Sequence, residues 1–110
     1  LQAAADAGIL GIGVDSNQNW MQPGSVLTSM LKRVDVGVFD AFNDAREGNF
    51  TGGTVVMGVA EDGVGYSLDE HNAPLISDAM KASVDAAKAG IISGEIIVHD
   101  FLVDNTCPAS

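Results

Sequence analysis

The feature that most constrains the fold of this chain is a short apolar run that ends abruptly at a carboxylate. Residues 9–14 are apolar, and Asp15 follows them at the start of a loop rich in Asn, Gln, Pro and Gly. Such a run is typical of a strand in a parallel sheet that helices cover on both faces. Ligands of open α/β sheets bind beyond the carboxyl ends of the strands. Asp15 is therefore a candidate ligand-binding residue, the alternative being a cap for nearby backbone N–H groups.

A second predicted strand, residues 26–31, is followed directly by Lys32. Its hydroxyl-bearing and β-branched residues favour a strand, although apolar residues at a spacing of four would also fit a helix. Lys32 is one of only five basic residues in the chain. Most lysines are simply solvated, which is the alternative for Lys32. Its position beside another strand end favours the interpretation that Lys32 and Asp15 face one cleft.

The remaining segments alternate between helical and strand patterns. We expect helices at residues 1–7, 36–47 and 77–89, and strands at residues 54–59 and 95–103. Gly8, Gly48 and Gly90 are placed to end the three helices, and Asp35 is placed to cap the second. This order of elements predicts an α/β fold.

Composition narrows the classes of partner. Fifteen acidic and five basic residues give a formal net charge of −10, which repels nucleic acids and anionic membrane surfaces. The single cysteine, Cys107, excludes an internal disulfide and a CxxC motif. Cys107 is either a free thiol of the polar tail or the partner of a cysteine upstream of Leu1. Because the chain starts at Leu1, within an alanine-rich helical stretch, we expect it to be the C-terminal part of a longer protein.

Other polar and aromatic residues point to no catalytic centre. Adjacent Asp69, Glu70 and His71 predict a solvated loop rather than a metal site. His99 fits an exposed alternating position of the last strand, because no Ser or Cys nucleophile motif accompanies it. Trp20 either closes an edge of the core, the interpretation we favour, or stacks on a ligand. We therefore expect no enzyme activity, no metal and no cofactor.

Four segments together carry a family resemblance: GIGVDSNQ, PGSVLTSMLKRVDVGVFDAF, GGTVVMGVAEDGVGYSLDEHN and IISGEIIV. Over roughly residues 1–98 the chain resembles the C-terminal third of the basic membrane protein family, substrate-binding proteins of ABC importers that include purine nucleoside receptors. The resemblance implies a type I periplasmic-binding (Venus-flytrap) fold, with three-layer α/β lobes and mostly parallel sheets. Residues 1–110 would then supply the end of the second lobe and elements that return to the first.

The resemblance also implies roles for two residues. In nucleoside-binding members the aspartate of GVDS and the lysine of LKRVD hold the ribose hydroxyls, and these correspond to Asp15 and Lys32. The chemistry suits the residue types, because one carboxylate accepts from both hydroxyls of a vicinal diol while an ammonium group donates to sugar oxygens. The sequence departs from many members at Asn17, where they have an acidic residue.

These features lead us to expect the substrate-binding component of an ABC importer. Its expected ligand is a small polar solute, first of all a purine nucleoside, held in an interlobe cleft and delivered to the membrane permease. We expect the protein in the periplasm or, as a lipoprotein, on the cell surface of a bacterium. A further expected partner of the chain is the missing N-terminal part of the same protein. The alternative is an effector-binding module of a sensor or transcriptional regulator with the same fold.

Overall fold

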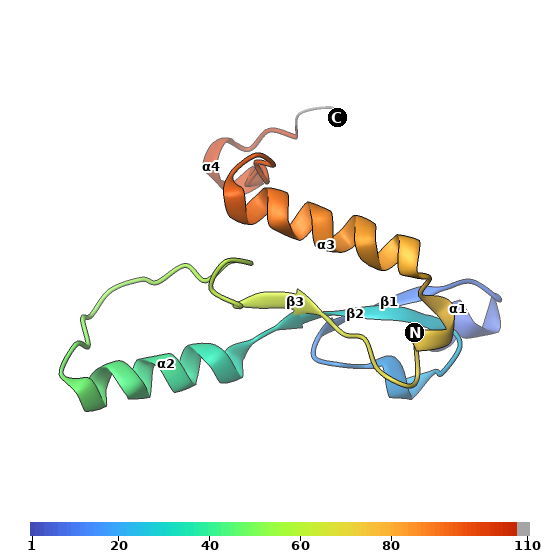
Figure 1. The fold of residues 1–110 in the computed structure, drawn as a ribbon. Helices are drawn as coiled ribbons and strands as arrows, with labels where there is room; N and C mark the ends of the chain where they lie inside the picture. The colour runs from blue at the N-terminus through green and yellow to red at the C-terminus, as the bar shows by residue number, and fades with distance from the viewer. Residues whose placement is uncertain (108–110) are drawn as a thin grey trace.

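The computed structural model of the chain describes residues 1–107 and confirms an α/β fold (Figure 1). Its elements are, in order, α1 (Gln2–Asp6), β1 (Gly11–Asp15), η1 (Asn19–Met21), β2 (Val26–Lys32), α2 (Val34–Glu47), β3 (Val64–Tyr66), η2 (Ala73–Leu75), α3 (Asp78–Ser93) and α4 (Phe101–Asp104). The strands predicted at residues 9–14 and 26–31 correspond to β1 and β2. The N-terminal helix is also present, and Gly8 follows it in the left-handed conformation at φ 67°.

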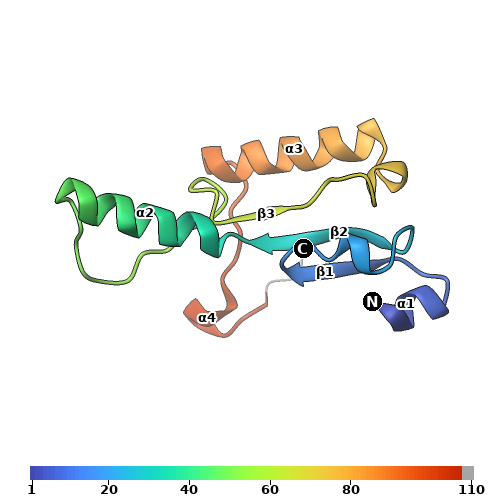
Figure 2. The same cartoon turned by 90° about the horizontal axis from the view of Figure 1, so that it is seen from below.

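The three strands form one sheet in the order β1-β2-β3 (Figure 2). β1 and β2 are parallel, with Asp15 opposite Leu31, whereas β3 is antiparallel to β2, with Val64 opposite Lys32. Because β1 and β2 are parallel neighbours, their carboxyl ends lie at the same edge of the sheet. This edge carries both predicted ligand-binding residues.

The helix α2 continues from the end of β2 and runs away from the sheet (Figure 1). It begins two residues earlier than predicted, and its N-cap is Arg33. The prediction that Asp35 caps it is therefore wrong: Asp35 lies in the first turn and accepts from the Arg33 guanidinium, with Nη2 2.8 Å from Oδ2. An acidic side chain is favourable in that turn because the backbone N–H groups there carry partial positive charge. Gly48 ends the helix as predicted, at φ 77°.

The helix α3 runs along the β3 side of the sheet (Figures 1 and 2). Residues of α3, β2 and β3 line a cavity of about 390 Å³. Ser77 caps it by accepting from the Met80 amide at 3.2 Å. The predicted stop at Gly90 is wrong, because the helix continues to Ser93 and ends at Gly94 with φ 79°. Gly90 is buried, and a β-carbon there would meet Ile96 Cδ1 at 2.8 Å. This glycine makes room for the chain that turns back after the helix.

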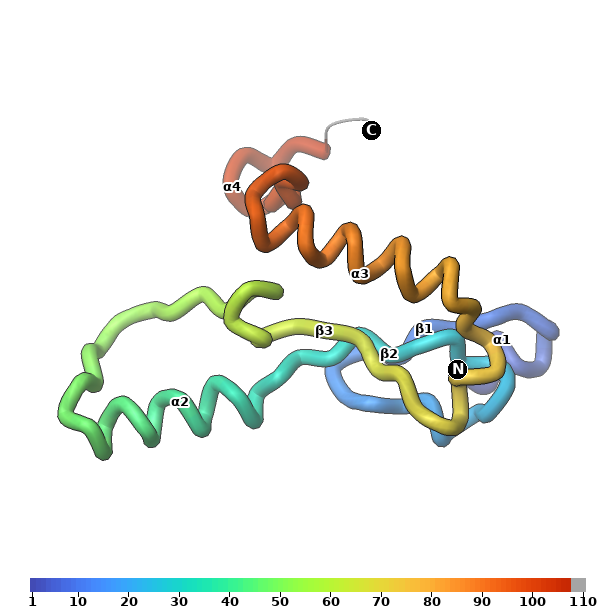
Figure 3. The backbone as a smooth tube through the Cα atoms, in the orientation of Figure 1, coloured from blue at the N-terminus to red at the C-terminus, as the bar shows by residue number. Residues whose placement is uncertain are grey.

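The two other predicted strands do not form. Residues 54–58 are irregular along the return from α2 (Figure 3), and Val55 and Val56 are 76% and 85% exposed. A strand needs a hydrogen-bonded neighbour, and none of the strands within residues 1–107 pairs with this segment. Residues 95–100 are likewise irregular, and α4 follows them after a cap by Asp100. Strand-like composition was not sufficient without a partner.

The interior of the described chain is polar. Val26, at 1% exposure, is its one buried hydrophobic side chain, whereas Asn19, Ser29 and Asn72 are completely buried. Large apolar side chains on β1, α2 and the irregular segments are instead exposed, among them Ile12, Val14, Phe39, Phe42 and Ile97. The described chain therefore exposes many large apolar side chains, whose contiguous patches in monomeric soluble proteins are small. Within residues 1–107, every helix is too short or too polar to span a membrane.

Candidate functional site

The candidate site is the edge of the sheet at which β1 and β2 end. Asp15 is the last residue of β1 and pairs with Leu31, the residue before Lys32. Both charged residues are exposed. Lys32 lines an open cavity of about 410 Å³ together with residues of α2 and the irregular segment, whereas Asp15 is not among its lining residues. The structure thus brings the two residues to one edge, on strands that are direct neighbours.

The backbone of Asp15 adopts a left-handed conformation, with φ 71°. Aspartate is one of the few residues other than glycine that enters this region readily. Within residues 1–107 no donor forms a hydrogen bond with its carboxylate, so the capping role is not seen there.

The loop after Asp15 is held to the sheet by consecutive hydrogen bonds. Gln18 Oε1 accepts from the Val14 amide at 3.0 Å, and the Gln18 amide donates to Ser29 Oγ at 3.0 Å. Ser29 Oγ in turn donates to Asn19 Oδ1 at 2.8 Å. Since Ser29 belongs to β2, the loop that follows one strand is anchored on the neighbouring strand.

A buried polar cluster extends this anchor to the segment after β3. The Ser67 hydroxyl donates to Asn19 Oδ1 at 3.1 Å, and it also accepts from the Ser29 amide at 3.0 Å. The Asn72 amide group donates to the carbonyls of Leu27, at 2.8 Å, and Ser67, at 3.0 Å. Every buried side-chain polar atom of the described residues has a hydrogen-bond partner, as a stable polar interior requires.

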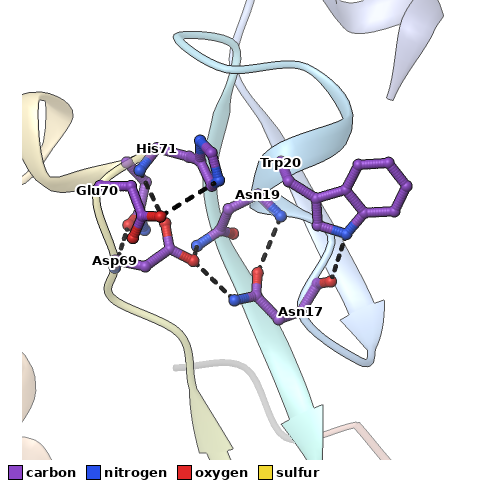
Figure 4. A network of polar contacts seen from close by, with 7 residues as sticks. Asn17, Asn19, Trp20, Asp69, Glu70 and His71 are labelled. Atoms are coloured by element: carbon purple, nitrogen blue, oxygen red, sulfur yellow. Dashed lines mark hydrogen bonds and ion pairs between the residues drawn. The ribbon is translucent and has the colours of Figure 1, made fainter.

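Asp69 joins the two loops (Figure 4). Its Oδ2 accepts from Asn17 Nδ2 at 2.6 Å and from Asn19 Nδ2 at 3.1 Å, while Oδ1 accepts from the His71 amide at 2.9 Å. The hydrogen bond from Asn17, followed by those from His71 and Asn19, lowers the pKa of Asp69 below its ordinary value, against the opposing effect of desolvation. Each of these donors favours the ionised carboxylate.

The residues predicted to be solvated differ in their outcome. Asp69 and His71 are structured by these hydrogen bonds, so the solvated-loop prediction holds only for Glu70, whose side chain is 82% exposed. Within the part of the chain that the structure describes, no three His, Cys, Asp or Glu side chains gather as metal ligands would. His99 lies outside any strand and its Nε2 contacts the Thr106 carbonyl at 2.9 Å. Cys107 is exposed and free.

The prediction that Trp20 closes an edge of the core is also wrong. Its side chain is 62% exposed, because it lies on η1 at the outer side of the loop. The indole Nε1 donates to the Asn17 carbonyl at 3.2 Å. Figure 4 shows the ring directed away from the polar network. The hydrogen bond fixes an exposed aromatic surface on the same loop that follows Asp15.

Sequence reasoning missed Asn19 and Asp69 as site residues. Asn17 and Asp69 are separated by 52 positions, so no local pattern relates them. One local signal existed: Asp69 Oδ1 accepts from the backbone amide of His71, two residues further on, at 2.9 Å, the spacing by which aspartate often stabilises a turn. That spacing predicts an ordered turn, but it does not predict what the turn contacts.

A parallel strand pair with polar loops gathered beyond its carboxyl edge defines the class of α/β ligand-binding folds. Two solved structures superpose on the chain. A solute-binding protein of an ABC transporter system from Aeropyrum pernix K1 superposes with a TM-score of 0.67 at 32% identity, over 89% of this chain and 35% of that one. A transcriptional activator of the comK gene from Bacillus halodurans superposes with a TM-score of 0.76 at 20% identity, over 89% and 34%, and shows the fold alone. The chain has the periplasmic-binding fold.

The family follows from the sequence comparison. The Bmp family, described as ABC transporter substrate-binding protein PnrA-like, matches residues 1–101, so the chain belongs to this family. An uncharacterized lipoprotein of Pyrococcus abyssi is 42% identical over 57 residues, which are 52% of this chain and 14% of that protein. The chain therefore spans about a third of the two solved structures and a smaller part of this relative.

Proposed function

We propose that this chain is part of the substrate-binding component of an ABC importer and that its ligand is a purine nucleoside. The observation that carries the proposal is the position of Asp15 and Lys32 at the ends of two paired parallel strands. Membership of the Bmp family supports transport of a small molecule. The nucleoside itself is proposed from the GVDS and LKRVD motifs and from the chemistry of these two side chains.

In this proposal Asp15 accepts hydrogen bonds from the ribose hydroxyls and Lys32 donates to sugar oxygens. Hydrogen bonds that involve a charged group are shorter and stronger than neutral ones, which suits a ligand that itself carries no charge. The Lys32 ammonium makes no ion pair within residues 1–107, so it is available to balance the carboxylate when the cleft closes. Neither charge would then be buried without a counter-charge.

The ligand would lie between this edge and a second lobe. We propose that residues 1–110 complete one lobe and return to the other, because the chain spans about a third of the solved structures that it resembles. The exposed apolar residues of β1 and α2 are the surfaces that the rest of such a protein would cover. The likeness to a lipoprotein supports a location in the cell envelope, beside the permease that would receive the ligand.

Equilibrium calorimetry on the full-length protein tests the proposal. Adenosine, guanosine and inosine are titrated separately, with D-ribose and the free bases as controls. We expect saturable binding of at least one purine nucleoside and weaker binding of ribose and base alone, because each control lacks part of the contacts. Absence of heat with all three nucleosides would contradict the assignment and leave only the broader family function.

A further inference from the structure

We propose that Asp69 is a positioning residue that fixes the loop after β1 and thereby the carboxylate of Asp15. The part of this inference that concerns ligand affinity rests on the proposed function. The part that concerns the loop rests on the hydrogen bonds alone. In Figure 4 the Asp69 carboxylate faces the amide groups of two loop residues at once.

Two residues of the loop after β1 donate hydrogen bonds to Asp69. Oδ2 receives the Asn17 amide at 2.6 Å and the Asn19 amide at 3.1 Å. These two residues are also joined to each other, because the Asn19 backbone amide donates to Asn17 Oδ1 at 3.0 Å. One carboxylate oxygen therefore closes a small ring of hydrogen bonds that sets the conformation of residues 17–19.

The other end of the link is firmly held. The Asp69 amide donates to Asn72 Oδ1 at 2.8 Å, and the Asp69 carbonyl accepts from the Ala73 amide at 2.9 Å. Asn72 is completely buried and donates to the Leu27 carbonyl in β2 at 2.8 Å. Asp69 thus connects the loop after β1 to β2 through hydrogen bonds.

A carboxylate suits this position better than an amide of the same shape. Both of its oxygens face donors: the two asparagine amides at Oδ2 and the His71 amide, 2.9 Å away, at Oδ1. An asparagine side chain has one acceptor and one donor group, so in either orientation it would direct a donor against a donor. The substitution Asp69→Asn therefore breaks at least one side of the link while preserving size.

The consequence for Asp15 follows from its place in the chain. Only Ser16 separates Asp15 from Asn17. The backbone of Asp15 has φ 71°, an unfavourable conformation for a residue other than glycine, which is kept only where surrounding contacts hold it in place. Fixing Asn17 therefore fixes the direction from which the Asp15 carboxylate leaves the sheet. A preorganised acceptor binds more tightly, since less conformational freedom is lost when the ligand arrives.

The test compares Asp69→Asn with the matched control Glu70→Gln in the full-length protein. Both variants remove one negative charge, at adjacent positions, but the exposed Glu70 makes only a 3.8 Å contact with His71. Hydrogen exchange read by mass spectrometry reports opening of residues 16–21, with α3 as an internal reference. Calorimetric titration with adenosine, at a temperature well below the melting temperature of each variant, reports the affinity for the nucleoside. Asn17→Ala, at an exposed position, repeats the test with a milder change.

We expect Asp69→Asn to accelerate exchange in residues 16–21 and to weaken adenosine binding, each by about tenfold or more, the effect of losing a hydrogen bond to a charged group. Asn17→Ala should shift both readings in the same direction and Glu70→Gln should shift neither. Unchanged exchange in Asp69→Asn would overturn the inference. Accelerated exchange with unchanged affinity would also overturn it, because Asp69 would then serve stability alone.

Failure of the proposed function gives a different pattern. If the wild-type protein binds no nucleoside, the ligand assignment is wrong. Hydrogen exchange alone then tests whether Asp69 fixes the loop after β1. In that case faster exchange in Asp69→Asn but not in Glu70→Gln supports the link between the loops. Equal exchange in wild type and Asp69→Asn overturns it.

Discussion

Gly13 of β1 and Ser29 of β2 lie opposite each other in the parallel register, and the Ser29 hydroxyl occupies the space where a β-carbon of residue 13 would project. That hydroxyl accepts from the Gln18 amide at 3.0 Å and donates to Asn19 Oδ1 at 2.8 Å. The absence of a side chain at Gly13 therefore allows the loop after β1 to be anchored on the adjacent strand.

Gly13→Ala should destabilise the full-length protein by about 1–3 kcal/mol, the usual cost of forcing extra volume into a packed site. The added methyl group would displace the Ser29 hydroxyl or the Gln18 side chain, whose Cβ lies 3.0 Å from the expected position. Urea unfolding measures the change. The matched control is Gly65→Ala on β3, where a β-carbon meets nothing within 4 Å. Equal effects of the two substitutions would contradict this account of the anchor.

Sequence patterns predicted β1 and β2. These predictions are correct because each strand has a neighbouring strand to pair with in the chain itself. The same reasoning failed for residues 54–59, whose composition is as strand-like but which have no paired strand within residues 1–107. A helix end was predicted correctly at Gly48, which adopts the left-handed conformation. The end predicted at Gly90 was wrong, because that glycine lies inside the helix and makes room for Ile96. Local patterns report backbone preference, whereas burial and pairing depend on distant residues.

The candidate site divides in the same way. The positions of Asp15 and Lys32 could be predicted because each lies at the end of a strand-like run, and the parallel pairing then brings them to one edge. The link through Asp69 could not, because it joins loops separated by 52 positions. The exposure of Trp20 was also missed, since an aromatic residue in a loop is compatible with either surface or core.

The contribution of Asp69 to stability should depend on pH. Its pKa is lowered in the folded state, first by the hydrogen bond from Asn17, so the stabilisation is present above the ordinary value of 3.8 and is lost as the pH falls through the folded-state pKa. In the full-length protein, Asn17→Ala should therefore reduce the free energy of unfolding more at about pH 6 than at about pH 3. Urea unfolding across this range measures the difference, and a pH-independent effect would contradict it.

Residues 1–110 produced alone should self-associate. Their exposed apolar side chains include Phe42 at 75% and Val56 at 85% exposure, and contiguous apolar surface beyond a few hundred Å² drives association. Sedimentation velocity should show oligomers or swapped dimers, and addition of the remaining part of the protein should reduce them. A compact, cooperatively unfolding monomer of this segment would contradict the proposal that it contributes to two lobes.

Lys32→Met should weaken purine nucleoside binding by the full-length protein by about 1.5–3 kcal/mol, the range for a hydrogen bond that involves a charged group. The melting temperature of the ligand-free protein should change little, because Lys32 is exposed and outside the ion pairs of the described residues. Lys81→Met on α3 is the matched control, since its ammonium pairs with Asp85 on the same helix. Unaltered affinity in Lys32→Met would identify Lys32 as a solvated lysine.

The role of Asp15 is tested by comparing ribo- and 2′-deoxynucleosides on wild-type protein and Asp15→Ala, with Asp44→Asn on α2 as a control for charge. If the carboxylate accepts from both ribose hydroxyls, a 2′-deoxynucleoside leaves one acceptor position unpaired. It should bind the wild-type protein more weakly by about 1–3 kcal/mol, and Asp15→Ala should lose most of this discrimination.

Calorimetric titration of adenosine and 2′-deoxyadenosine against the full-length wild-type protein shows whether the Asp15 carboxylate recognises the ribose diol. Adenosine should bind about five- to 150-fold more tightly than 2′-deoxyadenosine, the ratio that corresponds to one unpaired buried acceptor. Equal affinity for the two ligands would contradict the assignment of Asp15 to the ribose diol.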